Sequence, residues 1–270
     1  MIPYDYHIHT DFSCDCDVPM AEMCRAAIAR GLPEIGFTEH FDLVPEDPCY
    51  ASFRVEAWWK ELERCRETFG EALVIRAGIE AGEPHRFTTA VAQLLARFPW
   101  DYCLGALHWV GPTMIWNREY YDQPEDQAYR DYFAELGRVA MAGGFDILAH
   151  MDALKRYGVE RYGPYDPRRY EADIRAVLRA CAESDLALEI NTSSLRRSIR
   201  ETSPAQLVLT WFRQEGGRWV TVGSDAHLPE HVGFGLEQCL DTIHAAGFES
   251  VACFERRRPS PIPITRSSAR

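Results

Sequence analysis

The feature that most constrains this chain is a regular alternation of short apolar segments with longer amphipathic ones. Seven such pairs follow one another, and no internal repeat relates them. Strands that alternate with helices favour a parallel sheet with right-handed crossovers. For a chain of 270 residues, a closed or nearly closed barrel is the natural form. Because eight units are usual, seven predict an α/β fold of the distorted (β/α)7 TIM-like barrel type.

Hydrophobic periodicity and glycine or proline punctuation give the expected boundaries. Strands are predicted at 4–10, 34–38, 73–79, 102–107, 146–149, 186–190 and 219–222. Helices are predicted at 20–30, 55–69, 88–97 and 170–184; another helix is predicted to end at 141, and another to begin at Pro204. Loops are predicted at 109–124 and 151–167. We expect one barrel domain over 1–264 and a disordered tail at 265–270. An open doubly wound sheet is the alternative, but it would usually bring a glycine-rich phosphate motif after its first strand, and none is present.

Composition narrows the classes of function. The net charge of −12 argues against a surface for nucleic acid polymers, which needs clustered Lys and Arg. No apolar run is long enough to span a bilayer, and no signal segment is recognisable at the start. We therefore expect a soluble, cytoplasmic protein. Nine cysteines without Cys-x-x-Cys spacing are interpreted as reduced thiols that mostly fill the core, rather than as a disulfide framework or a structural zinc site.

Potential metal ligands fall at the ends of the predicted strands. His7 and His9 are two residues apart, so in a strand both side chains point to the same face. The carboxyl ends of parallel barrel strands meet at one mouth, which carries the chemistry of such folds. Six strands aim metal-binding groups at this mouth: His7 with His9, His40, Glu80, His108, His150, and Asp225 with His227. His85, His231 and His244 do not share this placement and are assigned to surface, loop and helix, although His231 could still touch a substrate.

So many ligands exceed what one ion uses, since a catalytic zinc takes about three protein ligands and a water. Several ions must therefore share the mouth, and a carboxylate can bridge two of them. Mixed imidazole and carboxylate donors suit zinc, iron or manganese, and the sequence leaves the choice open.

Over nearly its whole length, the chain resembles the PHP (polymerase and histidinol phosphatase) superfamily, and within it the PHP-type histidinol-phosphate phosphatases. The motifs that carry the resemblance are His7-Ile8-His9-Thr10, Phe12-Ser13-Cys14-Asp15, Thr38-Glu39-His40-Phe41-Asp42, Gly78-Ile79-Glu80, Gly105-Ala106-Leu107-His108, Asp146 to Asp152, Lys155-Arg156-Tyr157, Glu189 to Ser193 with Arg196, and Gly223-Ser224-Asp225-Ala226-His227.

The resemblance implies a seven-stranded barrel with three divalent or trivalent transition-metal ions. It places His7, His9, Glu80 and Asp225 around one ion, and Glu80, His108 and His150 around a second, so that Glu80 is the bridge. Asp15, His40 and His227 would hold the third. Asp15 is implied by the resemblance alone, because it lies on the loop after the first strand and not at a strand end.

The activity that the resemblance implies is hydrolysis of a small phosphate monoester, with L-histidinol phosphate, an intermediate of histidine biosynthesis, as the expected substrate. A metal-bridged hydroxide beside Glu80 would attack phosphorus, and Arg156 with Arg196 would clamp the phosphate. The other arginines nearby (Arg168, Arg169, Arg197 and Arg200) are interpreted as solvated charges. Asp225 or His227 could give the leaving group its proton. Asp152 is expected to orient His150 or an arginine.

Two alternatives stay open. The first is a PHP phosphoesterase that acts on a nucleotide, a phosphotyrosine peptide or another small phosphate ester, because the metal site would be the same. The segment 109–124, with its several aromatic residues, could select among such substrates. The second is a non-catalytic PHP module, which would be expected to lack some of the nine ligand positions, and here all nine are filled. The sequence does not specify the oligomeric state.

Overall fold

The computed structural model describes residues 2–264, so the predicted tail at 265–270 lies outside the described residues. Seven parallel strands form one sheet, in the order β1-β2-β3-β4-β7-β8-β9. Their bounds are β1 Tyr4–Ile8, β2 Glu34–Phe41, β3 Val74–Gly82, β4 Tyr102–Ala106, β7 Ile147–Leu148, β8 Ala187–Asn191 and β9 Val220–Gly223. Neighbours in the sheet therefore follow one another along the chain, as in a barrel built from successive β-α units.

The sheet curls into a nearly closed barrel. The end of β1 meets the segment just after β9, where Ile8 and Ala226 form an isolated parallel bridge. The amide of His9 donates to the Ala226 carbonyl at 2.9 Å. The predicted distorted seven-stranded barrel is thus confirmed, and its seam closes beside the first predicted ligands.

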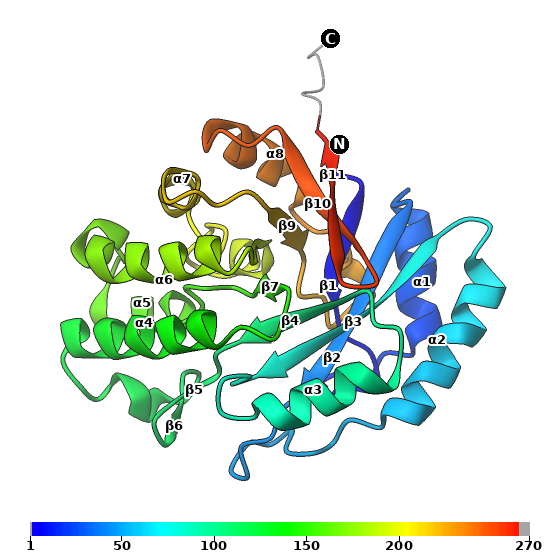
Figure 1. The fold of residues 1–270 in the computed structure, drawn as a ribbon, viewed down its shortest axis with the longest axis horizontal. Coiled ribbons are helices and arrows are strands. Elements are labelled where there is room, and N and C mark those ends of the chain that lie inside the picture. Colours follow the sequence, from blue (N-terminus) through cyan, green and yellow to red (C-terminus); the bar gives the residue numbers. More distant parts are fainter. Residues whose placement is uncertain (1, 265–270) are drawn as a thin grey trace.

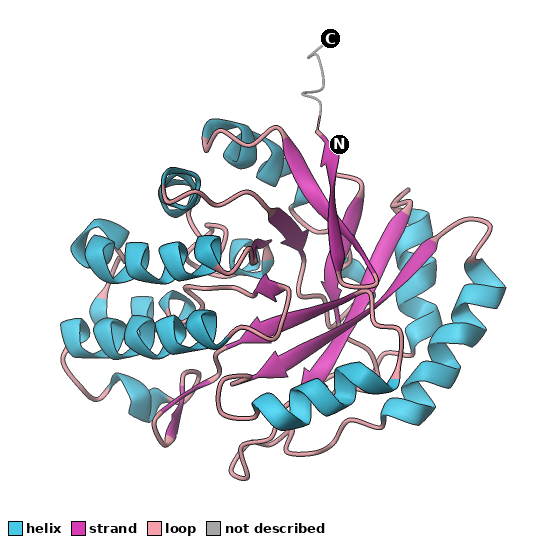
Figure 2. Cartoon of the chain, viewed as in Figure 1, coloured by secondary structure: helices cyan, strands magenta, loops and turns pink. Residues whose placement is uncertain are grey.

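Helices cover the outside of the barrel (Figures 1 and 2). The bounds are α1 Met20–Ala29, α2 Val55–Phe69, α3 Thr88–Arg97, α4 Glu125–Ala142, α6 Glu171–Glu183, α7 Gln206–Gln214 and α8 Leu236–Ala245. Each turns an apolar stripe inward, as in α2, where Trp58, Leu62 and Cys65 are buried. In the part of the chain that the structure describes, no helix combines the length and apolar character needed to cross a bilayer.

Several predicted boundaries differ from the structure. β1 ends at Ile8 instead of 10, and β2 and β3 run on to Phe41 and Gly82, past the predicted ends at 38 and 79. The predicted loop 151–167 contains a helix, α5 Lys155–Tyr162, which buries Lys155 and Arg156 where a helical pattern would show apolar residues. The helix expected from Pro204 begins at Gln206. The segment 109–124 carries a short hairpin, β5 Trp109–Val110 with β6 Thr113–Met114, and a 3-10 turn at Arg118–Tyr121. Periodicity missed α5 because its inward face is charged.

The interior of the barrel is filled by aromatic rings toward the amino ends of the strands. Tyr4, Tyr6 and Tyr102 stack, with ring centroids 3.7 and 4.9 Å apart. A Cβ atom at Gly36 or Gly78 would overlap the Tyr102 ring, so both positions need glycine.

An antiparallel hairpin, β10 Ser250–Glu255 with β11 Arg258–Pro263, covers this end of the barrel. The Tyr4 hydroxyl donates to the carbonyl of Ala252, and the amide of Arg257 donates to the carbonyl of Asp101. With that end closed, the carboxyl ends of the strands are the side on which a ligand can enter.

Candidate metal centre

The carboxyl ends of the strands surround a cavity of about 690 Å³. Seven predicted ligands line it: Asp15, His40, Glu80, His108, His150, Asp225 and His227. His7 and His9 lie on its floor and are fully buried. The structure therefore brings all nine predicted ligand positions together.

Four ligand atoms converge beneath the cavity. Nε2 of His7 lies 3.1 Å from Nε2 of His9. Oε2 of Glu80 is 3.4 Å from the His7 nitrogen and 3.6 Å from the His9 nitrogen. Oδ1 of Asp225 lies 3.9 and 3.7 Å from the same two atoms. One ion could contact all four atoms.

The second oxygen of Glu80 faces a different pair of histidines. Its Oε1 lies 2.8 Å from Nε2 of His150 and 3.4 Å from Nε2 of His108. Oε2 also lies 3.2 Å from Nδ1 of His40. Because its two oxygens face different histidines, Glu80 has the placement of a bridging ligand. We call His7, His9, Glu80, His108, His150 and Asp225 the inner group.

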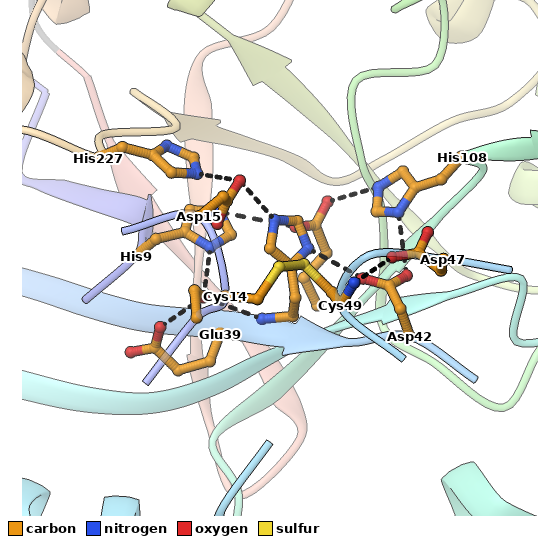
Figure 3. The surroundings of a disulfide bond; sticks show 12 residues. His9, Cys14, Asp15, Glu39, Asp42, Asp47, Cys49, His108 and His227 are labelled. Carbon is orange, nitrogen blue, oxygen red and sulfur yellow. Dashed lines mark hydrogen bonds and ion pairs between the residues drawn. A yellow bond between two sulfur atoms is a disulfide. The ribbon is translucent and has the colours of Figure 1, made fainter. Parts of the chain in front are cut away.

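The remaining three ligands form an outer group at the cavity rim: Asp15, His40 and His227. Oδ2 of Asp15 lies 3.4 Å from Nε2 of His40 and 3.1 Å from Nε2 of His227. Asp15 comes from the loop after β1, and Figure 3 shows its carboxylate facing His227. His9 is close enough to be a fourth donor to this group.

The inner group fits a cation on the evidence of its hydrogen bonds. Nδ1 of His7 lies 2.6 Å from Glu189, which as a carboxylate can only accept, so this nitrogen carries the proton. Nδ1 of His9 lies 3.0 Å from the hydroxyl of Ser13, which itself donates to Glu39. In the neutral form of both rings, the two Nε2 atoms would present lone pairs to each other at 3.1 Å. Oε2 of Glu80 lies beside them, buried and without a hydrogen bond, and a cation would satisfy all three atoms.

Buried carboxylates behind the histidines were not predicted as functional. Glu189 fixes His7, Glu39 acts on His9 through Ser13, and Oδ1 of Asp42 lies 3.0 Å from Nδ1 of His108. Such partners set the tautomer and orientation of a ligating imidazole. Acidic residues inside apolar strands, as Glu39 and Glu189 are, are the sequence signal that could have identified them.

The protonation states of the carboxylates and of His9 suit metal ligands; for His7, burial lowers the pKa, but Glu189 and Glu80 raise it well above its usual value. Burial raises the pKa of Glu80, but the charges of His7 and His40 outweigh this and hold it well below its usual range. Burial likewise raises the pKa of Asp225, but the charges of His7 and Arg156 outweigh this and hold the pKa well below its usual value. For His9, burial and then the neighbouring histidines hold the pKa well below normal. The carboxylates are therefore charged and His9 is neutral at neutral pH.

Local backbone geometry supports this arrangement. Asp225 has φ +54°, in the left-handed region that few residues other than glycine adopt. Gly223, two residues earlier in the chain, leaves space for His7 and Glu189, because a Cβ atom there would collide with both side chains. Strained positions of this kind persist where the surrounding structure fixes them, often at functional sites.

Both predicted phosphate-binding arginines line the cavity. Arg156 is buried; its Nη2 donates to Asn191 at 2.9 Å, and its Nη1 lies 3.4 Å from Oδ2 of Asp225. Arg196 donates to the backbone carbonyls of Ser224 and Asp225 at 2.8 and 3.0 Å. Burial lowers the pKa of Arg196. The guanidinium groups of both arginines lie on the Asp225 side of the cavity.

Part of the cavity wall is aromatic. The ring of Trp116 lies 5.0 Å from that of His108 and 6.0 Å from that of Tyr157. Arg197, interpreted from the sequence as a solvated charge, is exposed but also lines the cavity, with its guanidinium over the Tyr157 ring. His231 lines the cavity too.

Asp152 does not have the predicted partners. Its carboxylate lies 2.9 Å from Nζ of Lys155 and accepts from the hydroxyl of Ser203, so it contacts neither His150 nor an arginine. Lys155 also reaches Glu201 at 3.0 Å. Asp152 therefore anchors the segment that follows Arg196.

The prediction that all cysteines are free thiols was wrong. Cys14 and Cys49 form a disulfide at the cavity rim, with Cα atoms 5.3 Å apart (Figure 3). The other seven cysteines are free and buried, as expected for core residues. The pair is 35 residues apart in sequence, and only the return of the chain after β2 brings the two residues together, so no local spacing could reveal it.

Comparison with known proteins agrees with this geometry. The family model described as PHP domain matches residues 5–193. A histidinol-phosphatase of Lactococcus lactis is 30% identical over 258 residues, covering 93% of each chain. A probable histidinol-phosphatase of Deinococcus radiodurans is 29% identical over 264 residues, covering 95% of this chain and 98% of that one.

A solved structure is also similar over almost the whole chain. It is histidinol phosphate phosphatase from Lactococcus lactis in complex with zinc, L-histidinol and phosphate, with a TM-score of 0.86 and 27% identity. The match covers 96% of this chain and 98% of that one.

Proposed function

The chain belongs to the PHP domain family, and from that premise we propose that it is a metal-dependent phosphatase that hydrolyses L-histidinol phosphate to L-histidinol and phosphate. The observation that carries this proposal is the two-sided placement of Glu80 between separate histidine pairs. It sits in a chain that matches a histidinol-phosphatase along 93% of its length.

We assign the nine ligands to three ions. His7, His9, Glu80 and Asp225 would hold the first, and Glu80, His108 and His150 the second. The outer group of Asp15, His40 and His227 would hold the third. Zinc is the preferred identity, because imidazole and carboxylate donors suit it and the similar Lactococcus lactis structure contains zinc.

Bound ions of this kind neutralise phosphate charge and lower the pKa of a water from 15.7 to about 7. The chain itself supplies the clamp for the phosphate. Arg156 and Arg196 place fixed positive charge on one side of the cavity, and their hydrogen bonds to Asn191 and to backbone carbonyls hold them in position before substrate arrives. Preorganised donors of this type stabilise charge that develops in the transition state.

Asp225 has separate tasks for its two oxygens in this proposal. Oδ1 faces His7 and His9, whereas Oδ2 faces Ser193 at 3.2 Å and Arg156 at 3.4 Å. Oδ2 would thereby hold Arg156 and Ser193 in position beside the phosphate.

The substrate assignment is tested by turnover of the zinc-loaded protein on L-histidinol phosphate, phosphotyrosine and a nucleoside monophosphate. We expect kcat/KM for L-histidinol phosphate to exceed the others by about 10²-fold, near 2.7 kcal/mol. A preference for the nucleotide or for phosphotyrosine would contradict the substrate while leaving phosphatase chemistry intact. The absence of hydrolysis of all three would contradict the proposed function.

A further inference from the structure

The Cys14–Cys49 disulfide joins two loops at the cavity rim, and one of them carries Asp15. It joins the loop after β1 to the loop after β2, and in the view of Figure 3 it lies between the Asp15–His227 side and the Asp42–His108 side. Asp15 is the adjacent residue to Cys14. Any freedom at Cys14 is therefore passed directly to Asp15, the single carboxylate of the outer group.

The Cys49 end of the bridge is held independently of the disulfide. Asp47 accepts from the Cys49 amide at 2.7 Å and from the indole of Trp109 at 2.7 Å. The amide of Ala51 donates to the carbonyl of Asp42 at 3.0 Å. Since Cys49 and Asp47 are buried, this loop is a fixed anchor whether or not the sulfur–sulfur bond is present.

The Cys14 end has much less support. Within residues 2–264, neither Cys14 nor Asp15 makes a backbone hydrogen bond, and both residues are exposed. The nearest fixed points are the hydroxyl of Ser13, which donates to Glu39 at 2.7 Å, and the thiol of Cys16, 3.3 Å from the carbonyl of His227. Between Ser13 and Cys16, the disulfide is the one covalent restraint on the backbone that presents Asp15.

We propose that the Cys14–Cys49 pair is a redox-sensitive restraint that sets how tightly the outer group of Asp15, His40 and His227 binds its ion. This inference rests on the proposed metal centre. With the disulfide formed, Asp15 is held against the two imidazoles. With the disulfide reduced, the segment 14–15 gains freedom, and ordering Asp15 on binding then costs conformational entropy that lowers affinity. The inner group, carried by strand ends, keeps its ions in both states.

The chemistry requires a dithiol as the partner. A thiolate of the dithiol attacks the sulfur of exposed Cys14, forms a mixed disulfide and releases Cys49 as a thiolate that takes up a proton. The second thiol of the partner then closes its own disulfide and releases Cys14. Two electrons and two protons pass from the dithiol to the protein, and the reverse reaction uses the oxidised partner.

The test compares zinc binding by the full chain in the oxidised state and after reduction. A phosphine is the reductant, because thiols would compete for zinc; it becomes a phosphine oxide with oxygen from water. Alkylation followed by mass measurement should count two more free thiols after reduction. We expect reduction to weaken the most weakly held ion by about tenfold, the lower end of the effect of losing a positioning contact, and to leave the tighter ions unchanged.

Matched variants test whether the disulfide itself causes the change in zinc affinity. Cys49→Ser and Cys14→Ser should both bind zinc as the reduced wild type does and should not respond to phosphine. Cys181→Ala, which removes a buried free thiol of α6, should respond as the wild type. Equal zinc affinity in both redox states, a failure to find two additional thiols, or a response to phosphine in both serine variants would overturn the proposal.

Activity on L-histidinol phosphate separates this proposal from the proposed function. A protein that hydrolyses the substrate with the same zinc affinity in both redox states keeps the function and loses the redox restraint. A protein whose zinc affinity follows the disulfide but which does not hydrolyse the substrate keeps the restraint and loses the function.

Discussion

The inner and outer groups of ligands use the same residue types but are held in different ways. In the inner group, the side chains of His7 and Glu80 are 0% and 1% exposed, and buried carboxylates orient the imidazoles. In the outer group, Asp15 is 48% exposed and His227 is 27% exposed. Strand ends fix most of the first group, whereas Asp15, the one carboxylate of the second, comes from a loop and its cross-link. We infer that affinity is graded across one cavity, from tightly held inner ions to an exchangeable outer ion.

The largest effect is expected from removing the carboxylate that both inner sites share. Glu80→Gln should lower kcat/KM by about 10³-fold or more, near 4 kcal/mol, and should reduce zinc content by more than one ion per chain. The reason is that each Glu80 oxygen faces a different histidine pair. Kinetics and elemental analysis measure both effects, with exposed Glu71→Gln as the control. Loss of only one ion with full activity would contradict this account, because Glu80 would then not be shared by two inner ions.

The next effect concerns an arginine that is presented by a loop. Arg196→Ala should cost about 2 to 4 kcal/mol in kcat/KM, the scale of losing a preorganised donor. Zinc content should stay unchanged, since the guanidinium contacts backbone carbonyls and not ligand atoms. Arg200→Ala on the same segment, which is exposed, should have little effect. Equal activity of the two variants would remove Arg196 from the phosphate site.

A smaller effect should follow when an orienting carboxylate of the inner group is neutralised. Glu189→Gln keeps the shape and the acceptor oxygen beside His7 but loses the charge that makes the imidazole more basic. We expect zinc affinity to fall by about 10- to 100-fold, while exposed Glu237→Gln in α8 leaves it unchanged. Competition with a chelator measures the change. Unaltered affinity would mean that burial alone holds the inner group.

A histidine–carboxylate contact outside the cavity serves as the reference for the contacts inside it. Nε2 of His85 lies 2.6 Å from Glu135 of α4. Burial raises the pKa of Glu135, but Arg138, His85 and Arg86 outweigh it and lower the pKa to about 2, from an ordinary value of 4.5. A lowered carboxyl pKa stabilises the fold above pH 4.5, and that contribution is lost as the pH falls through about 2.

We therefore expect Glu135→Gln to lower the free energy of unfolding by about 1 kcal/mol at pH 7, with zinc content and kcat unchanged. The difference from the wild type should shrink as the pH falls from 5 towards 3.5, as measured by urea unfolding. A difference independent of pH would show that the contact contributes no charge-dependent stability.

The strand-end ligands could be predicted because two simple rules act together. A period of two places His7 and His9 on one face, and parallel strands bring Glu80, His108 and His150 to the same mouth. Neither rule needs long-range packing. Asp15 followed only from family resemblance, because a loop residue has no periodicity that reveals its direction.

What the sequence could not reveal depends on contacts between distant segments. Helix α5 was missed because its buried Lys155 and Arg156 pair with polar residues of distant segments, so its inward face is not apolar. The Cys14–Cys49 disulfide depends on how the loop after β2 returns to the loop after β1. The orienting role of Glu189 depends on β8 and β1 lying on either side of β9, where Gly223 leaves space for the contact. These are properties of the assembled barrel rather than of any local pattern.

The most direct test of the central claim is a stepwise removal of metal from the zinc-loaded protein. Chelators of increasing strength would be applied at equilibrium, with zinc content and kcat on L-histidinol phosphate followed at each step. We predict three ions per chain, one leaving before the other two, and an Asp15→Asn variant that lacks the early step. A protein that holds a single ion, or that keeps full activity after all zinc has been removed, would contradict the account.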